Sequence, residues 1–279
     1  MKNCYITAAE KFSKFDLLLF RCFGCKRLLK KNMVSKNGLN VIKIPLPPKM
    51  KEKQKKRYFT RLCAYLHDMD VQTICVQNIQ DHLLQYYLRC EFQIMKGSAV
   101  FYEMFQDFLT YFAGKKGYHL NECDLVLISN NPKEVKKYML KCVRIVKAIS
   151  VYTTNPGKFE NLANEFREKY GIFIHIKGKN DKVKKYNKIY INCEADRIVD
   201  EGFFQSVNLI DIYKIYKGGF SEILLSYKTN EEEFLKENRV IKNLSFTEFY
   251  FKIQHTNIDK ITIPIFLKDK NYKIVNIRK

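Results

Sequence analysis

The sequence predicts an α/β fold whose second half contains a mostly parallel sheet. The prediction rests on residues 123–176, where the apolar runs DLVLI, AISVY and IFIHI alternate with two segments of helical periodicity. Turn residues, SNNP and TTNPG, follow the first two apolar runs. Strands that alternate with helices in this way form parallel sheets, because a parallel pair needs a crossover between its strands.

The length and composition of the chain indicate one or two globular domains. The chain has 279 residues, of which 46% are hydrophobic and 28% are charged, so it is long enough for one large or two modest globular domains. Only 6 prolines and 11 glycines are present, which leaves little material for long flexible linkers.

The charge of the chain is strongly positive. Lys and Arg number 50 against 29 Asp and Glu, a formal net charge of +21. A coding bias toward A/T-rich codons accounts for many lysines but not for the shortage of acids. A positive excess of this size repels itself unless anions offset it. The charge therefore favours nucleic acid, a nucleotide, a phosphorylated metabolite or an acidic membrane surface as the partner.

The cysteines and the apolar runs indicate a cytoplasmic protein without a transmembrane segment. The nine cysteines are an odd number, and most lie within apolar patterns, as reduced thiols do. No apolar run approaches the roughly 20 residues that a membrane span needs. The run FDLLLFRCFGC is interrupted by Arg21 and has no small-residue cleavage site, so we do not interpret it as a signal peptide.

The first half of the chain is predicted to form a smaller α/β domain. Residues 1–37 give no clear assignment beyond one segment, TAAEKFSKFDLLLFRCF, that can form an amphipathic helix. Residues 39–46 alternate apolar side chains and end in prolines, which predicts a strand near an edge or its end. We then expect a helix over 49–70, a strand over 71–78, a helix over 79–90, a strand over 91–95 and a helix over 99–113 that Ser98 caps and Gly114 ends. In the helix over 79–90, the side chains expected to face inward are Ile79, Leu83, Tyr86 and Tyr87.

The second half begins with the strand–helix unit and continues with further strands. KIYINCEAD is expected to form the fourth strand and VNLIDIYKIY the fifth. FSEILLSY, the segment around LSFTEFYFKI, and KITIPIFL make up a C-terminal region, in which Pro264 suggests an edge strand. We therefore expect an α/β domain with a linking helix at residues 1–113, and a parallel-sheet domain with a C-terminal extension at residues 114–279.

The segment VYTTNPGKFENLANEF carries a resemblance to known proteins. It resembles the second strand and following helix of the NAD(P)-binding domains of shikimate dehydrogenase and glutamyl-tRNA reductase, over about 70 residues of the parallel unit. The resemblance implies a Rossmann-like, mostly parallel sheet preceded by a smaller α/β domain. The turn and helix positions that match are Thr153, Thr154, Asn155, Pro156, Lys158, Leu162, Ala163 and Phe166.

The first turn of the unit departs from the dinucleotide-binding pattern. That pattern, G-x-G-x-x-G, uses glycines for a tight turn and for close approach of the backbone to the pyrophosphate. Here the turn reads SNNPK, without a glycine. The second strand ends in two threonines, with no acid for a ribose hydroxyl and no Arg for a 2′-phosphate.

We therefore predict a diverged, non-catalytic Rossmann-like protein that binds an anionic ligand, either a nucleotide or a phosphorylated metabolite. A helix N-terminus attracts phosphate even where the glycines are missing. An NAD(P)-dependent oxidoreductase of the shikimate dehydrogenase type is the alternative. The residues expected to bind the ligand follow the first and second strands of the unit: Ser129, Asn130, Asn131, Lys133, Thr153, Thr154, Asn155 and Lys158.

The sequence assigns no residue a catalytic role. The dehydrogenase resemblance implies a Lys–Asp pair in the N-terminal domain, for which Lys43 or Lys49 with Asp81 are the candidates. The reductase resemblance implies a nucleophilic cysteine in that domain, but its cysteines lie in apolar patterns typical of core thiols. They are Cys63, Cys75 and Cys90.

No metal site is expected. Cys22 and Cys25 have the C-x-x-C spacing, but a zinc site needs a second pair, which the chain lacks. The histidines of the first half are isolated from one another: they are His67, His82 and His119. Three polar residues lie in or near the ends of predicted strands, where ligands of parallel sheets bind, although sheet-face positions are the simpler explanation. They are His175, Asn192 and Asp211.

A second alternative is a nucleic-acid-binding protein. The basic segments KMKEKQKKR and KGKNDKVKKYNK are rich in lysine, and the second contains an interleaved tyrosine, which suits phosphate contact and base stacking. A solvated lysine-rich surface is the simpler explanation, and no helix-turn-helix, zinc-finger or RNA-recognition motif is present. The residues assigned to this alternative are Lys51, Lys55, Lys56, Arg57, Lys184 and Lys185.

Overall fold

Two compact units make up the chain in the computed structural model. Unit 1 comprises Met1–Val100 and Gly219–Lys279, and unit 2 comprises Phe101–Gly218. The structure describes residues 2–8, 29–30, 32–44, 51–77, 79, 81–178, 188–193, 209–211, 223–255 and 263–277.

This division differs from the domain boundary expected at residue 113. The C-terminal residues from Gly219 onward group with unit 1 and not with the parallel sheet of unit 2. The physical reason is that helix α11 (Leu244–Gln254) packs against strand β4 (Val71–Gln77) of the N-terminal sheet.

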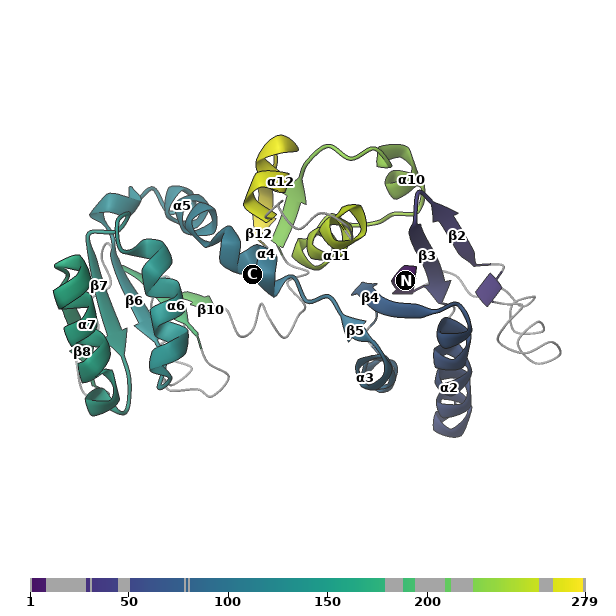
Figure 1. Cartoon of the computed structure of the whole chain (residues 1–279), viewed down its shortest axis with the longest axis horizontal. Coiled ribbons are helices and arrows are strands. Elements are labelled where there is room, and N and C mark those ends of the chain that lie inside the picture. Colours follow the sequence, from purple (N-terminus) through teal and green to yellow (C-terminus); the bar gives the residue numbers. More distant parts are fainter. Residues whose placement is uncertain are drawn as a thin grey trace. The chain divides into compact units, whose positions relative to one another are not determined.

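Unit 1 is built on a five-stranded sheet, which we call sheet A (Figure 1). Its strand order is β2-β3-β1-β4-β5, in which β1 is parallel to β3 and β4, β4 is parallel to β5, and β2 runs antiparallel to β3. The elements of unit 1 are β1 (Lys2–Ala8), β2 (Met33–Lys36), β3 (Leu39–Ile44), α2 (Glu52–Asp68), β4, α3 (His82–Glu91), β5 (Gln93–Ile94), β11 (Ile223–Ser226), α10 (Glu232–Glu237), α11, α12 (Ile263–Asp269) and β12 (Lys273–Ile277).

The central strand of sheet A, β1, lies in a segment for which the sequence predicts no strand. Its side chains alternate between the two faces of the sheet, and both faces are covered. Cys4 and Ile6 join the buried cluster under α2 and α3. On the opposite face, the ring of Tyr5 packs edge-on against Phe246 of α11, with centroids 5.7 Å apart.

Helices α2 and α3 pack side by side on the Cys4 face of sheet A. Their leucines enter one cluster, which contains Leu62 and Leu66 of α2 and Leu84 and Leu88 of α3. The expected inward position of Tyr86 is wrong, because this side chain is 65% exposed. Two leucines four residues apart form the apolar stripe of α3, and the tyrosine hydroxyl stays on the solvent side.

The C-terminal part of unit 1 covers the other face of sheet A. Helix α11 buries Phe246, Phe249 and Tyr250, and β11 pairs antiparallel with β12. The strand expected at residues 260–267 is wrong, because Ile263–Asp269 form the helix α12. Pro264 is the second residue of α12, and the missing N–H of a proline costs little in the first turn of a helix.

Unit 2 contains a second five-stranded sheet, sheet B, whose neighbouring strands are all parallel. The strand order is β10-β9-β6-β7-β8, which confirms the predicted α/β class with a mostly parallel sheet. The elements of unit 2 are α5 (Phe105–Lys115), η1 (Leu120–Glu122), β6 (Asp124–Ile128), α6 (Pro132–Cys142), β7 (Ala148–Tyr152), η2 (Pro156–Phe159), α7 (Glu160–Tyr170), β8 (Ile174–Lys177), β9 (Lys188–Asn192) and β10 (Leu209–Asp211).

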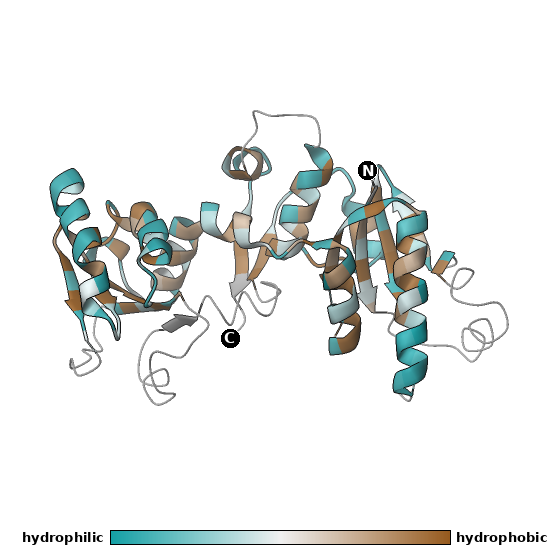
Figure 2. Ribbon diagram, turned by 60° about the horizontal axis from the view of Figure 1, so that its bottom comes forward, coloured by the Kyte–Doolittle hydropathy of each residue, from teal (hydrophilic) through white to brown (hydrophobic). Residues whose placement is uncertain are grey.

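The strands of sheet B form the core of unit 2, and Figure 2 shows their apolar residues against helices with hydrophilic outer surfaces. All five residues of β9 are buried, as are four of five in β6 and β7, as is usual for parallel strands covered on both faces. The helix expected at 99–113 is interrupted at Met104, which separates α4 (Ser98–Glu103) from α5. In the described part of the chain, no helix is both long and apolar enough to cross a membrane.

Candidate ligand-binding site

The strand order of sheet B creates a switch point between β6 and β9. The chain goes from β6 to β7 and β8 on one side, and then returns to β9 and β10 on the other. Ile128 of β6 is in register with Tyr152 of β7 and with Asn192 of β9, so the three carboxyl ends lie along one edge. Open parallel sheets bind their ligands at this edge, where the strand order reverses.

The turn after β6 forms without a left-handed residue. No residue between Ser129 and Lys133 has a positive φ, which explains why no glycine is needed here. The buried Ser129 hydroxyl accepts a hydrogen bond from the Asn131 N–H (2.9 Å), and Asn131 Oδ1 accepts one from the Lys133 N–H (3.0 Å). Asn131 is thus the N-cap of α6, and Pro132 occupies the first helical position.

Asn130 joins this turn to the one that follows β7. Its Oδ1 atom accepts hydrogen bonds from Thr153 Oγ1 (2.8 Å), Thr154 Oγ1 (2.9 Å) and the Thr154 N–H (3.0 Å). Thr153 is buried, and its hydroxyl also accepts a hydrogen bond from the Asn155 N–H (3.1 Å). The predicted ligand residues of the two turns are therefore brought together, with Asn130 acting as the connection between them.

Two lysines of this edge are exposed and uncompensated. Lys133 lies in the first turn of α6 and Lys158 in η2, directly before α7. Within the described residues neither side chain forms an ion pair, whereas Lys136 on the next turn of α6 is bound to Glu165 at 2.7 Å. A cation in the first turn of a helix is repelled by the positive end of the helix dipole, and a bound anion reduces this repulsion.

The turn after β6 differs from the glycine-rich turn of dinucleotide-binding proteins. In that pattern the turn carries no bulky side chain, so that its backbone comes close to the pyrophosphate. Here Pro132 has no N–H, and the N–H groups of Asn131 and Lys133 are already bonded within the turn. The Asn130 side chain is bonded to the turn after β7, and the residue that directly follows β7 is the buried Thr153, where dinucleotide-binding proteins have a ribose-binding acid.

Two buried titratable side chains packed near sheet B, Tyr138 and Cys142, have raised pKa values. Burial, and to a lesser degree the nearby Cys193, raises the pKa of the Tyr138 hydroxyl far above its usual range. Burial also raises the pKa of the Cys142 thiol to about 12. Both groups stay protonated at neutral pH and supply neither a base nor a nucleophile.

Asp81 is paired with a lysine that is neither of the two candidates from the sequence. Asp81 Oδ2 lies 2.5 Å from Lys55 Nζ of α2, and Asp81 Oδ1 caps α3 by accepting from the Leu84 N–H at 3.1 Å. Burial opposes ionisation of Asp81, but these hydrogen bonds outweigh it and hold its pKa below the usual range. No local pattern connects two residues this far apart in the sequence, and Lys49 lies outside the described residues.

The cysteines and histidines do not form a reactive centre in the described part of unit 1. Burial raises the pKa of Cys63 to about 11 and that of Cys75 far above its usual range, as expected for core thiols. The same expectation is wrong for Cys90, which is exposed near the C-terminal end of α3. His67 Nε2 contacts Glu91 at 3.1 Å. No group of three or more metal-ligating side chains occurs among the described residues. Cys22, Cys25, Lys184 and Lys185 lie outside them.

Other sequence-predicted residues are scattered over the molecule. His175 is exposed on the edge strand β8, and Asn192 is buried at the end of β9, where Asp211 of β10 is its register partner.

Of the cations assigned to nucleic acid, Lys55 is bound to Asp81 and Lys56 to Glu52 (3.1 Å). Lys51 precedes α2, and Arg57 is exposed on it.

The strand order of sheet B places the second unit in the Rossmann-like α/β fold class. No known protein family and no curated protein sequence match the chain. Solved structures similar to it include L-tryptophan dehydrogenase from Nostoc punctiforme (11% identity, TM-score 0.32, 91% of this chain and 89% of that chain). Two others are 5-ketofructose reductase of Gluconobacter sp. strain CHM43 (8%, 0.34, 97% and 98%) and shikimate 5-dehydrogenase from Listeria monocytogenes (10%, 0.31, 96% and 95%). The fold class follows from the strand order of sheet B. The similarity to these proteins concerns the fold and does not extend to their activities.

Proposed function

We propose that unit 2 binds a small anionic ligand, a nucleotide or a phosphorylated metabolite, at the turns after β6 and β7 and does not catalyse hydride transfer. The observation that carries the proposal is the three-bond connection from Asn130 to Thr153 and Thr154. This connection joins the two turns, and Lys133 and Lys158 belong to the helical turns that directly follow them.

The chemistry of these turns supports binding more than catalysis. The segments SNNPK and TTNPGK contain hydroxyls, amides and lysines, and neither contains a histidine or a carboxylate. The ammonium groups of the two lysines can donate hydrogen bonds to phosphate oxygens, whereas the hydroxyl protons of Thr153 and Thr154 are already donated to Asn130. General acid–base catalysis needs a group that titrates near the working pH, which these turns lack.

The experiment compares thermal unfolding and calorimetric titration of the protein with inorganic phosphate, ADP and NADPH. We expect stabilisation by phosphate-bearing ligands and no preference for the dinucleotide. The double variant Lys133→Gln, Lys158→Gln removes two charge-assisted contacts, and each such contact is worth about tenfold in affinity. We therefore expect the binding of ADP to weaken by about a hundredfold.

A matched variant controls for net charge. Lys116→Gln, Lys147→Gln removes two exposed lysines of unit 2 that lie after α5 and before β7, away from the carboxyl edge. This control is expected to bind ADP as the natural protein does. Absence of stabilisation by every anion, or equal weakening in both double variants, contradicts the proposed function.

A further inference from the structure

Helices α2 and α3 of unit 1 form a rigid outer layer. They are fastened at one end by Lys55 and Asp81 (2.5 Å) and at the other by His67 and Glu91 (3.1 Å). Between these pairs the rings of Phe59 and Tyr87 meet at 6.1 Å. The two helices therefore pack along each other, and their exposed sides belong to one surface of unit 1.

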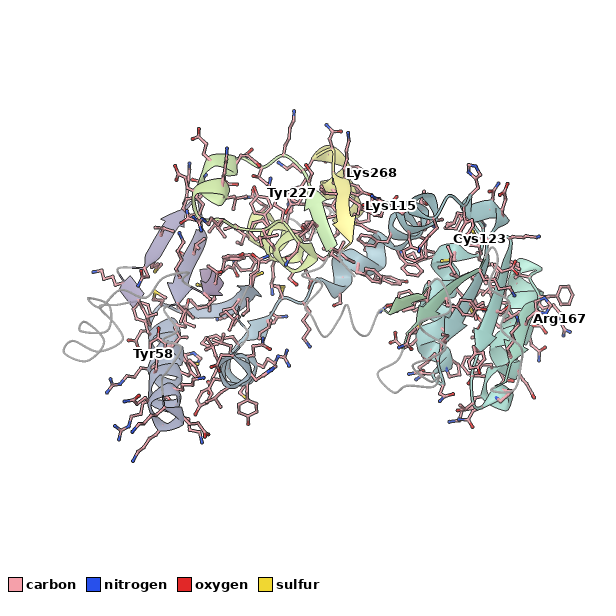
Figure 3. All side chains as sticks on the ribbon, turned by 180° about the vertical axis from the view of Figure 1, so that it is seen from behind. Tyr58, Lys115, Cys123, Arg167, Tyr227 and Lys268 are labelled. Atoms are coloured by element: carbon pink, nitrogen blue, oxygen red, sulfur yellow. The ribbon has the colours of Figure 1, made fainter. Side chains whose placement is uncertain are left out.

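The outer surface of α2 is a continuous basic stripe. Lys53, Arg57 and Arg61 are spaced four residues apart on the side opposite the buried Phe59 and Leu62, and all three are exposed. Within the described residues none of the three forms an ion pair. Figure 3 shows nitrogen-tipped side chains projecting from α2, the helix that carries the labelled Tyr58.

The outer surface of α3 adds an exposed aromatic ring beside a cation. Tyr86 is 65% exposed and points away from Leu84 and Leu88, which face the core. Arg89 follows Tyr86 by three residues, is exposed on the same side and forms no ion pair with a described residue. An exposed tyrosine ring combines an apolar face with a polar hydroxyl, which is why tyrosine is enriched at binding interfaces.

We propose that the outer α2–α3 surface, defined by Lys53, Arg57, Arg61, Tyr86 and Arg89, binds single-stranded nucleic acid. The cations have the charge that a phosphodiester backbone requires, and the exposed ring offers a stacking platform for one base. The exposed residues of α2 are charged, polar or alanine, so this helix has no apolar side chain to insert into a lipid surface. The surface lies in unit 1 and is independent of the ligand site proposed in unit 2.

The test measures fluorescence anisotropy of a labelled oligodeoxythymidine, and of a duplex of equal length, over a series of salt concentrations. We expect tighter binding of the single strand. The triple variant Arg57→Gln, Arg61→Gln, Arg89→Gln is expected to weaken binding by about tenfold or more and to reduce the salt slope by about 2, which corresponds to three phosphate contacts. Tyr86→Ala is expected to weaken binding roughly 5- to 100-fold through lost stacking and to leave the salt slope unchanged.

A matched triple variant carries the same change in charge elsewhere in unit 1. Lys228→Gln, Lys236→Gln, Lys268→Gln replaces three exposed lysines of the C-terminal part, and we expect a loss below about threefold, because salt screens distant charges. Equal losses in the two triple variants, or tighter binding of the duplex, overturn the proposal. Binding to anionic phosphatidylserine vesicles without binding to the oligonucleotide also overturns it.

Discussion

Three hydrogen bonds converge on one side-chain oxygen, Asn130 Oδ1, and all three donors belong to the turn after β7. The sequence points to this turn because polar residues follow an apolar run, but it does not distinguish a ligand residue from a structural one. Both uses need the same amide and hydroxyl groups at the same strand ends. Asn130 was predicted to meet a ligand, whereas its carboxamide oxygen holds the site together.

Replacement of Asn130 by alanine is expected to destabilise unit 2. Thr153 is buried, and without the Asn130 carbonyl its hydroxyl loses an acceptor that water does not readily replace. An unsatisfied buried polar group costs about 1–3 kcal/mol. We expect the free energy of unfolding of unit 2 to fall by this amount, which urea unfolding monitored by circular dichroism measures.

The aspartate variant separates structure from binding. Asn130→Asp keeps an acceptor oxygen for all three donors, so we expect nearly natural stability. Its negative charge lies between the turns that carry Lys133 and Lys158, and we expect it to repel an anionic ligand and lower the affinity for ADP. Natural stability of Asn130→Ala, or undiminished ADP binding by Asn130→Asp, contradicts this account.

Helices α2 and α3 show how a contact between elements escapes prediction. Lys55 and Asp81 come from different helices, and their pairing depends on how both pack on sheet A. The buried stripe of each helix follows from periodicity, since Leu62, Leu66, Leu84 and Leu88 recur at helical spacing. Periodicity does not predict which side chains of the two helices meet beside these buried stripes, because this depends on how the helices are rotated and how far apart they lie.

Loss of the Lys55–Asp81 pair is expected to make stability less dependent on pH. The pKa of Asp81 is lower in the folded protein than its ordinary value of 3.8, so its charge stabilises the fold above that value. The stabilisation is lost as the pH falls through the lower pKa of the folded state. Asp81→Asn keeps the cap on the Leu84 N–H and removes only the charge, which costs about 1 kcal/mol or less near neutral pH.

Urea unfolding at a series of pH values checks this expectation. The natural protein and Asp81→Asn are expected to differ at pH 7 and to converge as the pH falls below 3.8. A matched control is Glu52→Gln, which breaks the exposed pair with Lys56 on the same helix and is expected to change stability less. A difference between Asp81→Asn and the natural protein that stays constant with pH contradicts the assigned role.

One strand and one helix, β1 and α12, show the limits of sequence-based prediction at this scale. β1 has only seven residues, KNCYITA, and several of them are polar, so its sequence does not show the apolar pattern of a strand. In the structure both faces of β1 are covered, and Cys4, Tyr5 and Ile6 are fully buried. The β-branched residues of ITIPIF predict a strand, but a proline at the second helical position is compatible with α12. Long, strongly periodic segments such as those of sheet B were predicted correctly because local pattern and tertiary burial agree there.

At the scale of the whole molecule, the first and last parts of the chain fold together. The chain leaves unit 1 after Val100, forms unit 2 and returns to unit 1 at Gly219. The contact between Tyr5 and Phe246 joins residues from these two parts in one core. Sequence patterns report local periodicity and carry no information on such long-range closure, which is why the C-terminal part was assigned to the second domain.

Truncation of one aromatic ring tests this closure. Phe246 is fully buried against β1, and replacement of a buried phenylalanine by alanine costs about 3–5 kcal/mol because it leaves a cavity. Phe246→Ala is expected to accelerate amide hydrogen exchange in β1, β3 and β4 of sheet A, although the substitution lies about 240 residues from β1 in the sequence. The strands of sheet B are expected to keep their natural exchange rates.

Leu127→Ala, in the buried strand β6, is the matched control and is expected to accelerate exchange in sheet B alone. If Phe246→Ala instead accelerates exchange in sheet B and leaves sheet A unchanged, the C-terminal part packs on sheet B. That result contradicts the division into these two units.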